Sequence, residues 1–135
     1  MKVLVIGAKG QLGQDLLQAF SDVKVTPYDI EDVDIVDEAA VQQQIAFLAP
    51  DLVINSAAFT RVDECEREHV RAFQVNALGP LNLAKACKRW DVPLIHISTN
   101  YVFDGKKNSP YVEDDPASPV NAYGISKLAG EHYAL

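Results

Sequence analysis

Cysteine is scarce in this sequence, which has two cysteines, one tryptophan and one methionine among its 135 residues. Cys65 and Cys87 lack the close CxxC spacing of a redox or metal site, and both fall in segments with helical patterns. We therefore predict two reduced structural thiols in a cytoplasmic protein, and no metal ligands.

Long hydrophobic runs and an excess of basic residues are also missing. The apolar run Val3–Ile6 is too short for the core of a signal peptide and far too short to span a bilayer. Lysine and arginine number 12 against 19 acidic residues, for a formal net charge of −7. Because nucleic-acid binding depends on clustered lysine and arginine, we expect no nucleic-acid partner. Because no apolar run is long enough to span a bilayer, we also expect no membrane association.

Short apolar strands alternate with helical patterns along the chain. We predict strands at 2–6, 23–26, 51–56 and 92–98, and helices at 11–20, 38–48, 63–90 and 120–135, with a short apolar stretch at 33–36 and an acidic loop at 113–119. This order predicts an α/β fold with a doubly wound parallel sheet, in one domain over residues 1–135. Because the last helical pattern reaches Leu135 without a stop signal, we expect a fragment of a longer protein.

A glycine-rich loop lies between the first strand and the first helix. The segment Gly7–Gly13 has the form GxxGxxG and includes Gln11 and Leu12. In such a loop Gly7 allows a tight turn, Gly10 lets the backbone approach a pyrophosphate, and Gly13 permits close packing of helix on strand. The free N–H groups of the helix N-terminus favour an anion, so the loop predicts a dinucleotide site.

Two charged residues bear on which nicotinamide cofactor this loop binds. Asp29 follows the second strand at about the distance expected for an acid that binds the adenosine ribose. Asp29 favours NADH because it repels a 2′-phosphate, whereas Lys9 in the loop attracts that phosphate. The two effects oppose one another, so use of both NADH and NADPH is predicted. A plain turn role for Asp29 remains the alternative.

A tyrosine and a lysine stand four residues apart in the last helical pattern. Tyr123 and Lys127 therefore share a helix face, and a nearby cation lowers the pKa of a phenol from its ordinary value of about 10. Such a pair is common on helix surfaces. However, Ser98 and Thr99 end a predicted strand at the edge where these folds bind ligands. Together with the glycine loop, this order predicts a site that reduces a carbonyl group.

In these motifs the chain resembles the extended short-chain dehydrogenase/reductase family, and within it the dTDP-4-dehydrorhamnose reductases. The matching stretches are Gly7–Gly13, Asn55–Thr60, Val62–Asp63 with Glu66, Val75–Ala77, His96–Gly105 and Pro119–Glu131. They cover essentially the whole chain, and Ser98–Gly105 and Tyr123–Glu131 are the most specific to the family.

The resemblance implies a Rossmann-type NAD(P)-binding domain that lacks the C-terminal substrate domain of its family. The implied reaction is NADPH- or NADH-dependent reduction of the C4 keto group of dTDP-4-dehydro-L-rhamnose, or a related nucleotide-keto sugar, in dTDP-L-rhamnose and cell-surface polysaccharide biosynthesis. A homodimer is one implied assembly, in some relatives through Mg²⁺ bound by carboxylates beyond this chain. The fragment alone is expected to bind cofactor but turn over little substrate.

The resemblance also assigns residues. Thr99 orients the carbonyl, Tyr123 donates the proton, and Lys127 tunes the tyrosine and binds the ribose. The remaining implied contacts are Ala57, Ala58 and Thr60 near the nicotinamide, Asp34 and Ile35 near the adenine, Thr99, Asn100, Val102 and Phe103 near the substrate, and Asn76 as support of the Tyr-Lys site or as a structural helix residue.

Two departures and two alternatives accompany this interpretation. Asn100 stands where the family usually has aspartate, and Phe59 where it commonly has tyrosine, so a charge and a hydroxyl are lost. One alternative is another nucleotide-sugar enzyme, an epimerase or dehydratase, although dehydratases usually carry an acidic pair after the threonine. The other is a non-catalytic NADP-binding subunit, similar to the regulatory beta subunit of methionine adenosyltransferase.

Overall fold

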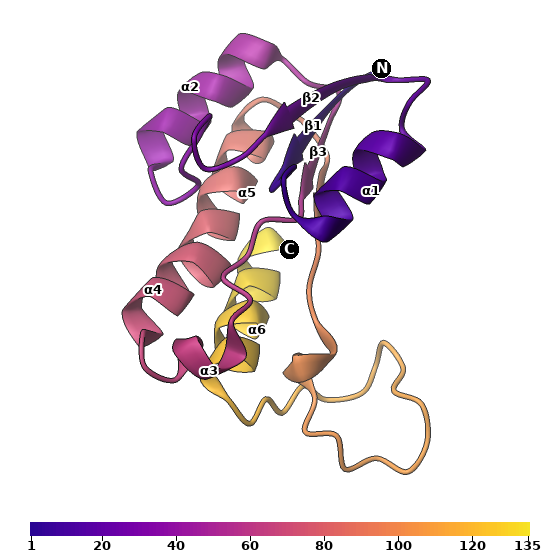
Figure 1. The fold of residues 1–135 in the computed structure, drawn as a ribbon, viewed down its shortest axis with the longest axis vertical. Coiled ribbons are helices and arrows are strands. Elements are labelled where there is room, and N and C mark those ends of the chain that lie inside the picture. Colours follow the sequence, from indigo (N-terminus) through magenta and orange to yellow (C-terminus); the bar gives the residue numbers. More distant parts are fainter.

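Four parallel strands form one sheet in the computed structural model, which describes residues 1–135 (Figure 1). The strands are β1 (Lys2–Ile6), β2 (Lys24–Tyr28), β3 (Leu52–Asn55) and β4 (Leu94–His96). Their order in the sheet is β2-β1-β3-β4, so the chain passes from one edge at β2 across β1 to reach β3. Parallel neighbours joined by crossovers are typical of dinucleotide-binding α/β folds.

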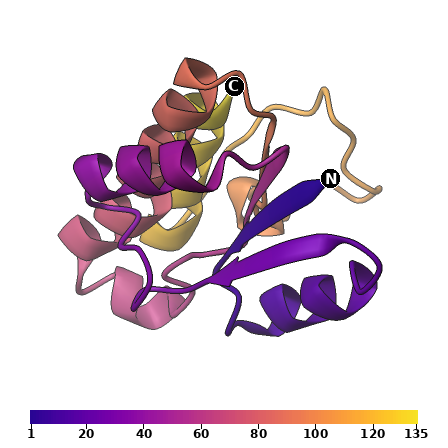
Figure 2. The same cartoon turned by 90° about the horizontal axis from the view of Figure 1, so that it is seen from above.

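Helices cover both faces of this sheet (Figure 2). The four long helices are α1 (Gln11–Ala19), α2 (Glu38–Leu48), α5 (Gly79–Arg89) and α6 (Ala122–Ala134). Val3 and Val5 of β1 pack toward α1, whereas Leu4 and Ile6 pack toward α2 and α5. All four side chains are almost fully buried, as expected for a central parallel strand with two covered faces. The predicted doubly wound α/β fold is therefore confirmed.

The predicted helix at 63–90 is wrong as a single element. The chain forms α3 (Val62–Cys65), α4 (His69–Phe73), η1 (Gln74–Leu78) and then α5. At the bend after α3, the Glu66 carboxylate accepts a hydrogen bond of 2.6 Å from the Ala122 N–H at the start of α6. The segment η1 is a π-helical turn, which holds more residues than an α-helical turn. The spacing of apolar residues indicates which side of a helix is buried, but it does not indicate where the helix bends or widens into a π-helical turn.

Strand β2, at the edge of the sheet, ends later than predicted. Strand β2 continues through Pro27 to Tyr28, whereas the prediction ended it at Thr26. Because β2 is an edge strand, the missing proline N–H costs no pairing on its outer side.

The stretch 33–36 has no regular structure, and it buries Val33 and Ile35 in the core. No helix of the structure is both long and apolar enough to cross a membrane.

Candidate functional site

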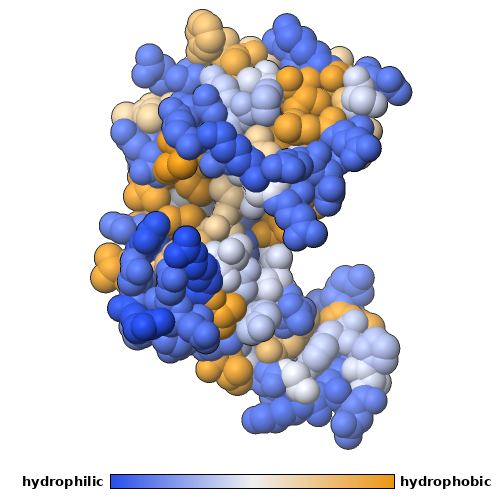
Figure 3. All heavy atoms as spheres, in the orientation of Figure 1, coloured by the Kyte–Doolittle hydropathy of each residue, from blue (hydrophilic) through white to orange (hydrophobic).

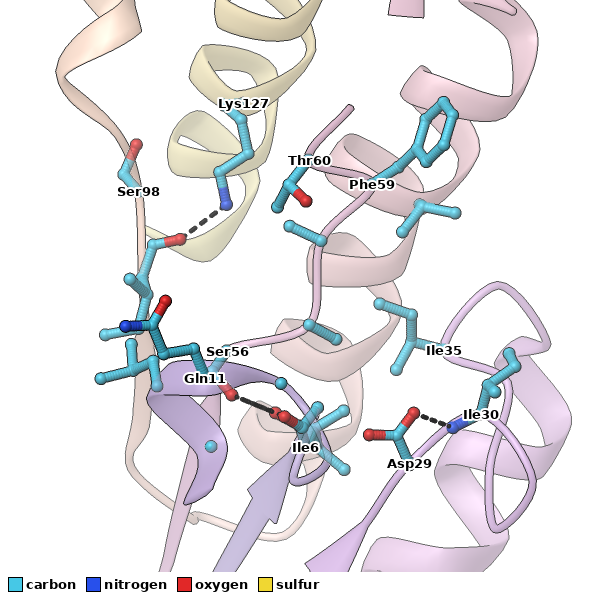
Figure 4. A pocket seen from close by; sticks show the side chains of 18 of the residues that line it. Ile6, Gln11, Asp29, Ile30, Ile35, Ser56, Phe59, Thr60, Ser98 and Lys127 are labelled. Atoms are coloured by element: carbon cyan, nitrogen blue, oxygen red, sulfur yellow. Dashed lines mark hydrogen bonds between the residues drawn. The ribbon is translucent and has the colours of Figure 1, made fainter. Parts of the chain in front are cut away.

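A cleft of about 820 Å³ lies at the carboxyl ends of β1, β2 and β3 (Figure 4). Figure 3 shows a hollow in the surface between the part of the molecule that carries the sheet and the part that carries α3 and α4. The predicted site residues that line it are Gly7, Gly10, Gln11, Leu12, Gly13, Asp29, Asp34, Ile35, Ala57, Ala58, Thr60, Tyr123 and Lys127. The predicted site residues outside the lining are Lys9, Thr99, Asn100, Val102 and Phe103.

The glycine loop forms one end of this cleft from bare backbone. Gly7 has a φ of +80°, and a Cβ there would lie 2.6 Å from the Ala57 nitrogen. A Cβ on Gly13 would lie 2.2 Å from the Gly7 carbonyl oxygen, so α1 packs directly against the turn. Side chains are excluded at both positions by backbone rather than by movable neighbours. The first N–H groups of α1 therefore open onto the cleft without cover.

The end of β2 brings an acidic residue to the same loop. The Asp29 carboxylate accepts a hydrogen bond of 2.8 Å from the Lys9 N–H and another of 2.9 Å from the Ile30 N–H. The Gly7 and Ala8 N–H groups both donate to the Tyr28 carbonyl, which ties the glycine loop to the end of β2. Asp29 is thus fixed at the cleft, and its place depends on the backbone of the glycine loop.

The floor of the cleft is the segment that follows β3. The Asn55 side chain accepts from the Ala57 N–H at 3.1 Å. Further along, the Asn76 side chain accepts from the Phe59 N–H at 2.7 Å and donates to the Phe59 carbonyl at 3.0 Å. Asn76 belongs to the π-helical turn η1 and also donates to the Ser126 hydroxyl of α6 at 3.1 Å. One buried amide thereby connects the cleft floor with the helix that carries the Tyr-Lys pair.

Lys127 is 2% exposed, and its ammonium donates to the Ile97 carbonyl at 2.6 Å (Figure 4). Burial lowers the pKa of Lys127 to about 8, and the negative charge of Glu131 opposes this shift. Burial raises the pKa of Tyr123, and hydrogen bonding with the Thr99 hydroxyl opposes that shift. The expected lowering of the Tyr123 pKa by Lys127 is therefore wrong for this structure, because burial has the larger effect and Lys127 is bound to Ile97.

Thr99 begins a short 3-10 turn, η2 (Asn100–Val102), that the sequence pattern did not predict. Its hydroxyl accepts from the Tyr101 N–H at 3.2 Å and donates to the Asn100 side chain at 3.4 Å. The Tyr101 ring lies edge-on to Tyr123, with ring centroids 5.6 Å apart. The turn thus holds Thr99 beside the phenol of Tyr123, although Thr99 itself is outside the cleft lining.

The two remaining predicted substrate residues face other neighbours. Val102 is buried, and the Phe103 ring stacks on Tyr111 at a centroid distance of 4.2 Å. In this chain they hold η2 and the loop that follows it. Their predicted contact with a substrate stays a prediction.

Several residues that line the cleft were not assigned a contact with cofactor or substrate from the sequence, although Ser98 was expected at this edge of the sheet. These residues are Ile6, Asp15, Ile30, Val33, Ser56, Phe59, Arg71, Val75, Ile97 and Ser98. Arg71 places its guanidinium 4.6 Å from the centre of the Phe59 ring. Because Arg71 reaches the cleft from a separate helix, its place depends on the bend between α3 and α4. The Ser98 hydroxyl donates to the Glu131 carboxylate on α6, a contact that local spacing does not show.

The parallel sheet, the glycine loop and the buried Tyr-Lys pair define a dinucleotide-binding domain of the short-chain dehydrogenase/reductase class. The family described as "RmlD substrate binding domain" matches the chain over residues 1–135. The chain belongs to this family, the RmlD-like dTDP-4-dehydrorhamnose reductases of the extended short-chain dehydrogenases/reductases.

Individual relatives agree with this placement. The chain is 46% identical to a dTDP-4-dehydrorhamnose reductase of Mycolicibacterium smegmatis, over 99% of this chain and 41% of the relative. A crystal structure of a dTDP-4-dehydrorhamnose reductase from Clostridium acetobutylicum superimposes with a TM-score of 0.97 at 42% identity, covering 99% of this chain and 49% of that one. The Bacillus anthracis enzyme, solved in complex with NADP, gives 0.94 at 37% identity, covering 98% and 48%. The chain thus spans about half the length of the proteins it matches.

Proposed function

We propose that this chain supplies the cofactor-binding and catalytic part of an NAD(P)H-dependent reductase. The proposed reaction converts the C4 keto group of dTDP-4-dehydro-L-rhamnose, or a related nucleotide-keto sugar, to an alcohol. The observation that carries the proposal is the placement of Tyr123 and Lys127 in the cleft that begins at the glycine loop, with Thr99 capping the turn whose Tyr101 ring packs against Tyr123. The reductase activity of the relatives and the NADP complex of one of them support it.

The cleft residues fit a nicotinamide dinucleotide. Gly7 and Gly13 leave a cradle of uncovered backbone at the start of α1, which suits a pyrophosphate. Asp29 lies near this cradle and Lys127 lines the same cleft at α6, so an extended ligand can contact both. The volume of about 820 Å³ falls within the range of small-molecule sites. These features suit either NADH or NADPH as the cofactor.

The chemistry assigned to the chain is proton donation and orientation. A bound nicotinamide supplies the hydride that reaches the carbonyl carbon. Tyr123, a phenol that is protonated at neutral pH, donates its proton to the carbonyl oxygen as that oxygen becomes a hydroxyl. Thr99 orients the carbonyl beside Tyr123, and the Lys127 ammonium, which lines the same cleft, binds the nicotinamide ribose.

The test is turnover by the full-length protein. With a dTDP-4-keto sugar present, the loss of NADH or NADPH absorbance measures reduction. Tyr123→Phe removes the proton donor, so turnover falls by about 10²–10⁴-fold, while the cofactor dissociation constant stays within about twofold of wild type. The matched control is Tyr133→Phe, which removes a hydroxyl from a half-exposed tyrosine on the same helix. Undiminished turnover in Tyr123→Phe would contradict the assignment.

The same assay separates the alternatives. A nucleotide-sugar epimerase retains its cofactor and shows no net cofactor oxidation, whereas a non-catalytic subunit binds NADP and leaves every keto sugar unchanged. The chain of residues 1–135 alone is expected to bind cofactor but to turn over little substrate. Full activity from residues 1–135 would contradict that expectation.

A further inference from the structure

The ammonium of Lys9 is held in an ion pair at the edge of the cofactor cleft. It lies 2.9 Å from a carboxylate oxygen of Glu31, and more than half of each side chain is exposed. The hydrogen bond between them raises the pKa of Lys9 and lowers that of Glu31. Lys9 is therefore engaged by Glu31, and it does not line the cleft.

The surroundings of this ion pair are strongly acidic. Asp29 lines the cleft and accepts from the backbone of Lys9. Asp32 accepts a hydrogen bond of 2.9 Å from the Asp29 N–H, so it lies on the same turn. Three carboxylates therefore gather around one ammonium, which Glu31 already neutralises. A further anion brought to this turn meets a net negative field.

In folds of this type the adenosine ribose binds beside the acid that follows the second strand. That ribose carries the 2′-phosphate that distinguishes NADPH from NADH. We propose that Glu31 sets a preference for NADH by holding Lys9 in its ion pair and by adding a second carboxylate beyond Asp29. The inference rests on the proposed cofactor binding but does not require a particular sugar substrate.

The test is a comparison of dissociation constants for NADH and NADPH, measured by cofactor fluorescence with full-length protein at low ionic strength. The wild-type protein binds NADH more tightly than NADPH. In Glu31→Gln, Lys9 becomes free to meet the phosphate, and the ratio of the NADPH to the NADH constant falls by about threefold to tenfold. The dissociation constant for NADPH changes, whereas that for NADH does not. The change is smaller at high salt because the charges of Lys9 and Glu31 are both exposed to solvent.

A matched control carries the same change of net charge. Glu38 forms a similarly exposed ion pair with Lys85 at 3.1 Å, and the side chains of this pair, unlike the Lys9 backbone that bonds to Asp29, have no hydrogen bond to a residue that lines the cleft. Glu38→Gln therefore leaves the ratio of the two constants unchanged. The double variant Glu31→Gln/Lys9→Gln loses most of the gain, because no cation remains to meet the phosphate.

Each outcome bears on a different statement. A wild-type preference for NADPH, an unchanged ratio in Glu31→Gln, or an equal change in Glu38→Gln would overturn the role of Glu31 while leaving the proposed reductase intact. Binding of neither cofactor would overturn the proposed function and this inference together.

Discussion

The side chain of Asn76 holds the backbone of Phe59 at both of its polar groups, accepting from the N–H and donating to the carbonyl. The amide is 1% exposed, so water cannot replace either bond without a change in packing. Because Asn76 also donates to Ser126, the residue before Lys127, one side chain joins the cleft floor to α6. We therefore expect Asn76 to position the cleft floor relative to Lys127.

Replacement of Asn76 by alanine leaves the N–H of Phe59 buried without a partner, and it leaves the Phe59 carbonyl with only the weak Cys65 thiol donor at 3.6 Å. We expect Asn76→Ala to lower the free energy of unfolding by about 3 kcal/mol, which urea denaturation measures. Gln74→Ala, an exposed change in the same π-helical turn, should change it by less than about 0.5 kcal/mol. Equal effects of the two substitutions would contradict the conclusion that the hydrogen bonds of Asn76 stabilise the fold.

The two glycines of the loop should differ in their tolerance of alanine. A Cβ on Gly13 would lie 2.2 Å from the Gly7 carbonyl oxygen, whereas one on Gly10 would lie 3.3 Å from the same atom. Gly13→Ala must push α1 off the loop, so we expect a lower melting temperature and cofactor binding weakened by at least about tenfold. Gly10→Ala should cost much less stability. A Gly13→Ala protein as stable as wild type would contradict the packing described.

Burial of Lys127 predicts a gain in stability at alkaline pH. Its pKa is about 8 in the folded protein, below the ordinary 10.5, so between these values the unfolded chain binds more protons. The free energy of unfolding should therefore rise as pH increases from about 8 to 10.5, by up to about 3 kcal/mol. Denaturation across this range measures the rise, and Lys127→Met should remove it. An equal rise in Lys127→Met would assign the effect to other groups.

His96 predicts a loss of stability at acidic pH. Its Nδ1 lies 3.1 Å from the Asn55 amide, and burial, with the nearby Lys127 charge, lowers its pKa to about 4 from the ordinary 6.5. The neutral ring is favoured in the fold, so stability falls as pH decreases from about 6.5 to 4, by up to about 3 kcal/mol. His96→Gln should flatten this decline, whereas the exposed His132→Gln should not. The same decline in both variants would contradict the assignment.

The sequence predicted the elements whose signals are local. Strand β1 and helix α2 have the predicted bounds, because one is a short apolar run before a glycine and the other begins after Asp37. The Asp37 side chain accepts from the Ala40 N–H at 3.0 Å, as expected of a residue that caps a helix. The lining of the cleft by most of the predicted cofactor residues follows from the order of the parallel strands.

Features that depend on distant contacts could not be predicted in this way. The ion pair of Lys9 with Glu31 forms because the glycine loop is tied to the end of β2, and nothing near either residue indicates the other. The raised pKa of Tyr123 follows from burial by neighbouring elements, whereas sequence reasoning considered only its partner on the same helix. The bend at Glu66 depends on a bond to the start of α6.

The π-helical turn η1 has a consequence for which changes of length this chain tolerates. A π-helical turn accommodates more residues than an α-helical one, so deletion of one residue within 74–78 would let the segment relax into an ordinary helix. The residue removed is the one that the wider turn absorbs, so α4 and α5 on either side would keep their orientation. Asn76 lies inside the turn, so it would lose the position from which it bonds to both Phe59 and Ser126. A deletion at this point should therefore spare the fold of the chain and loosen the cleft floor from α6.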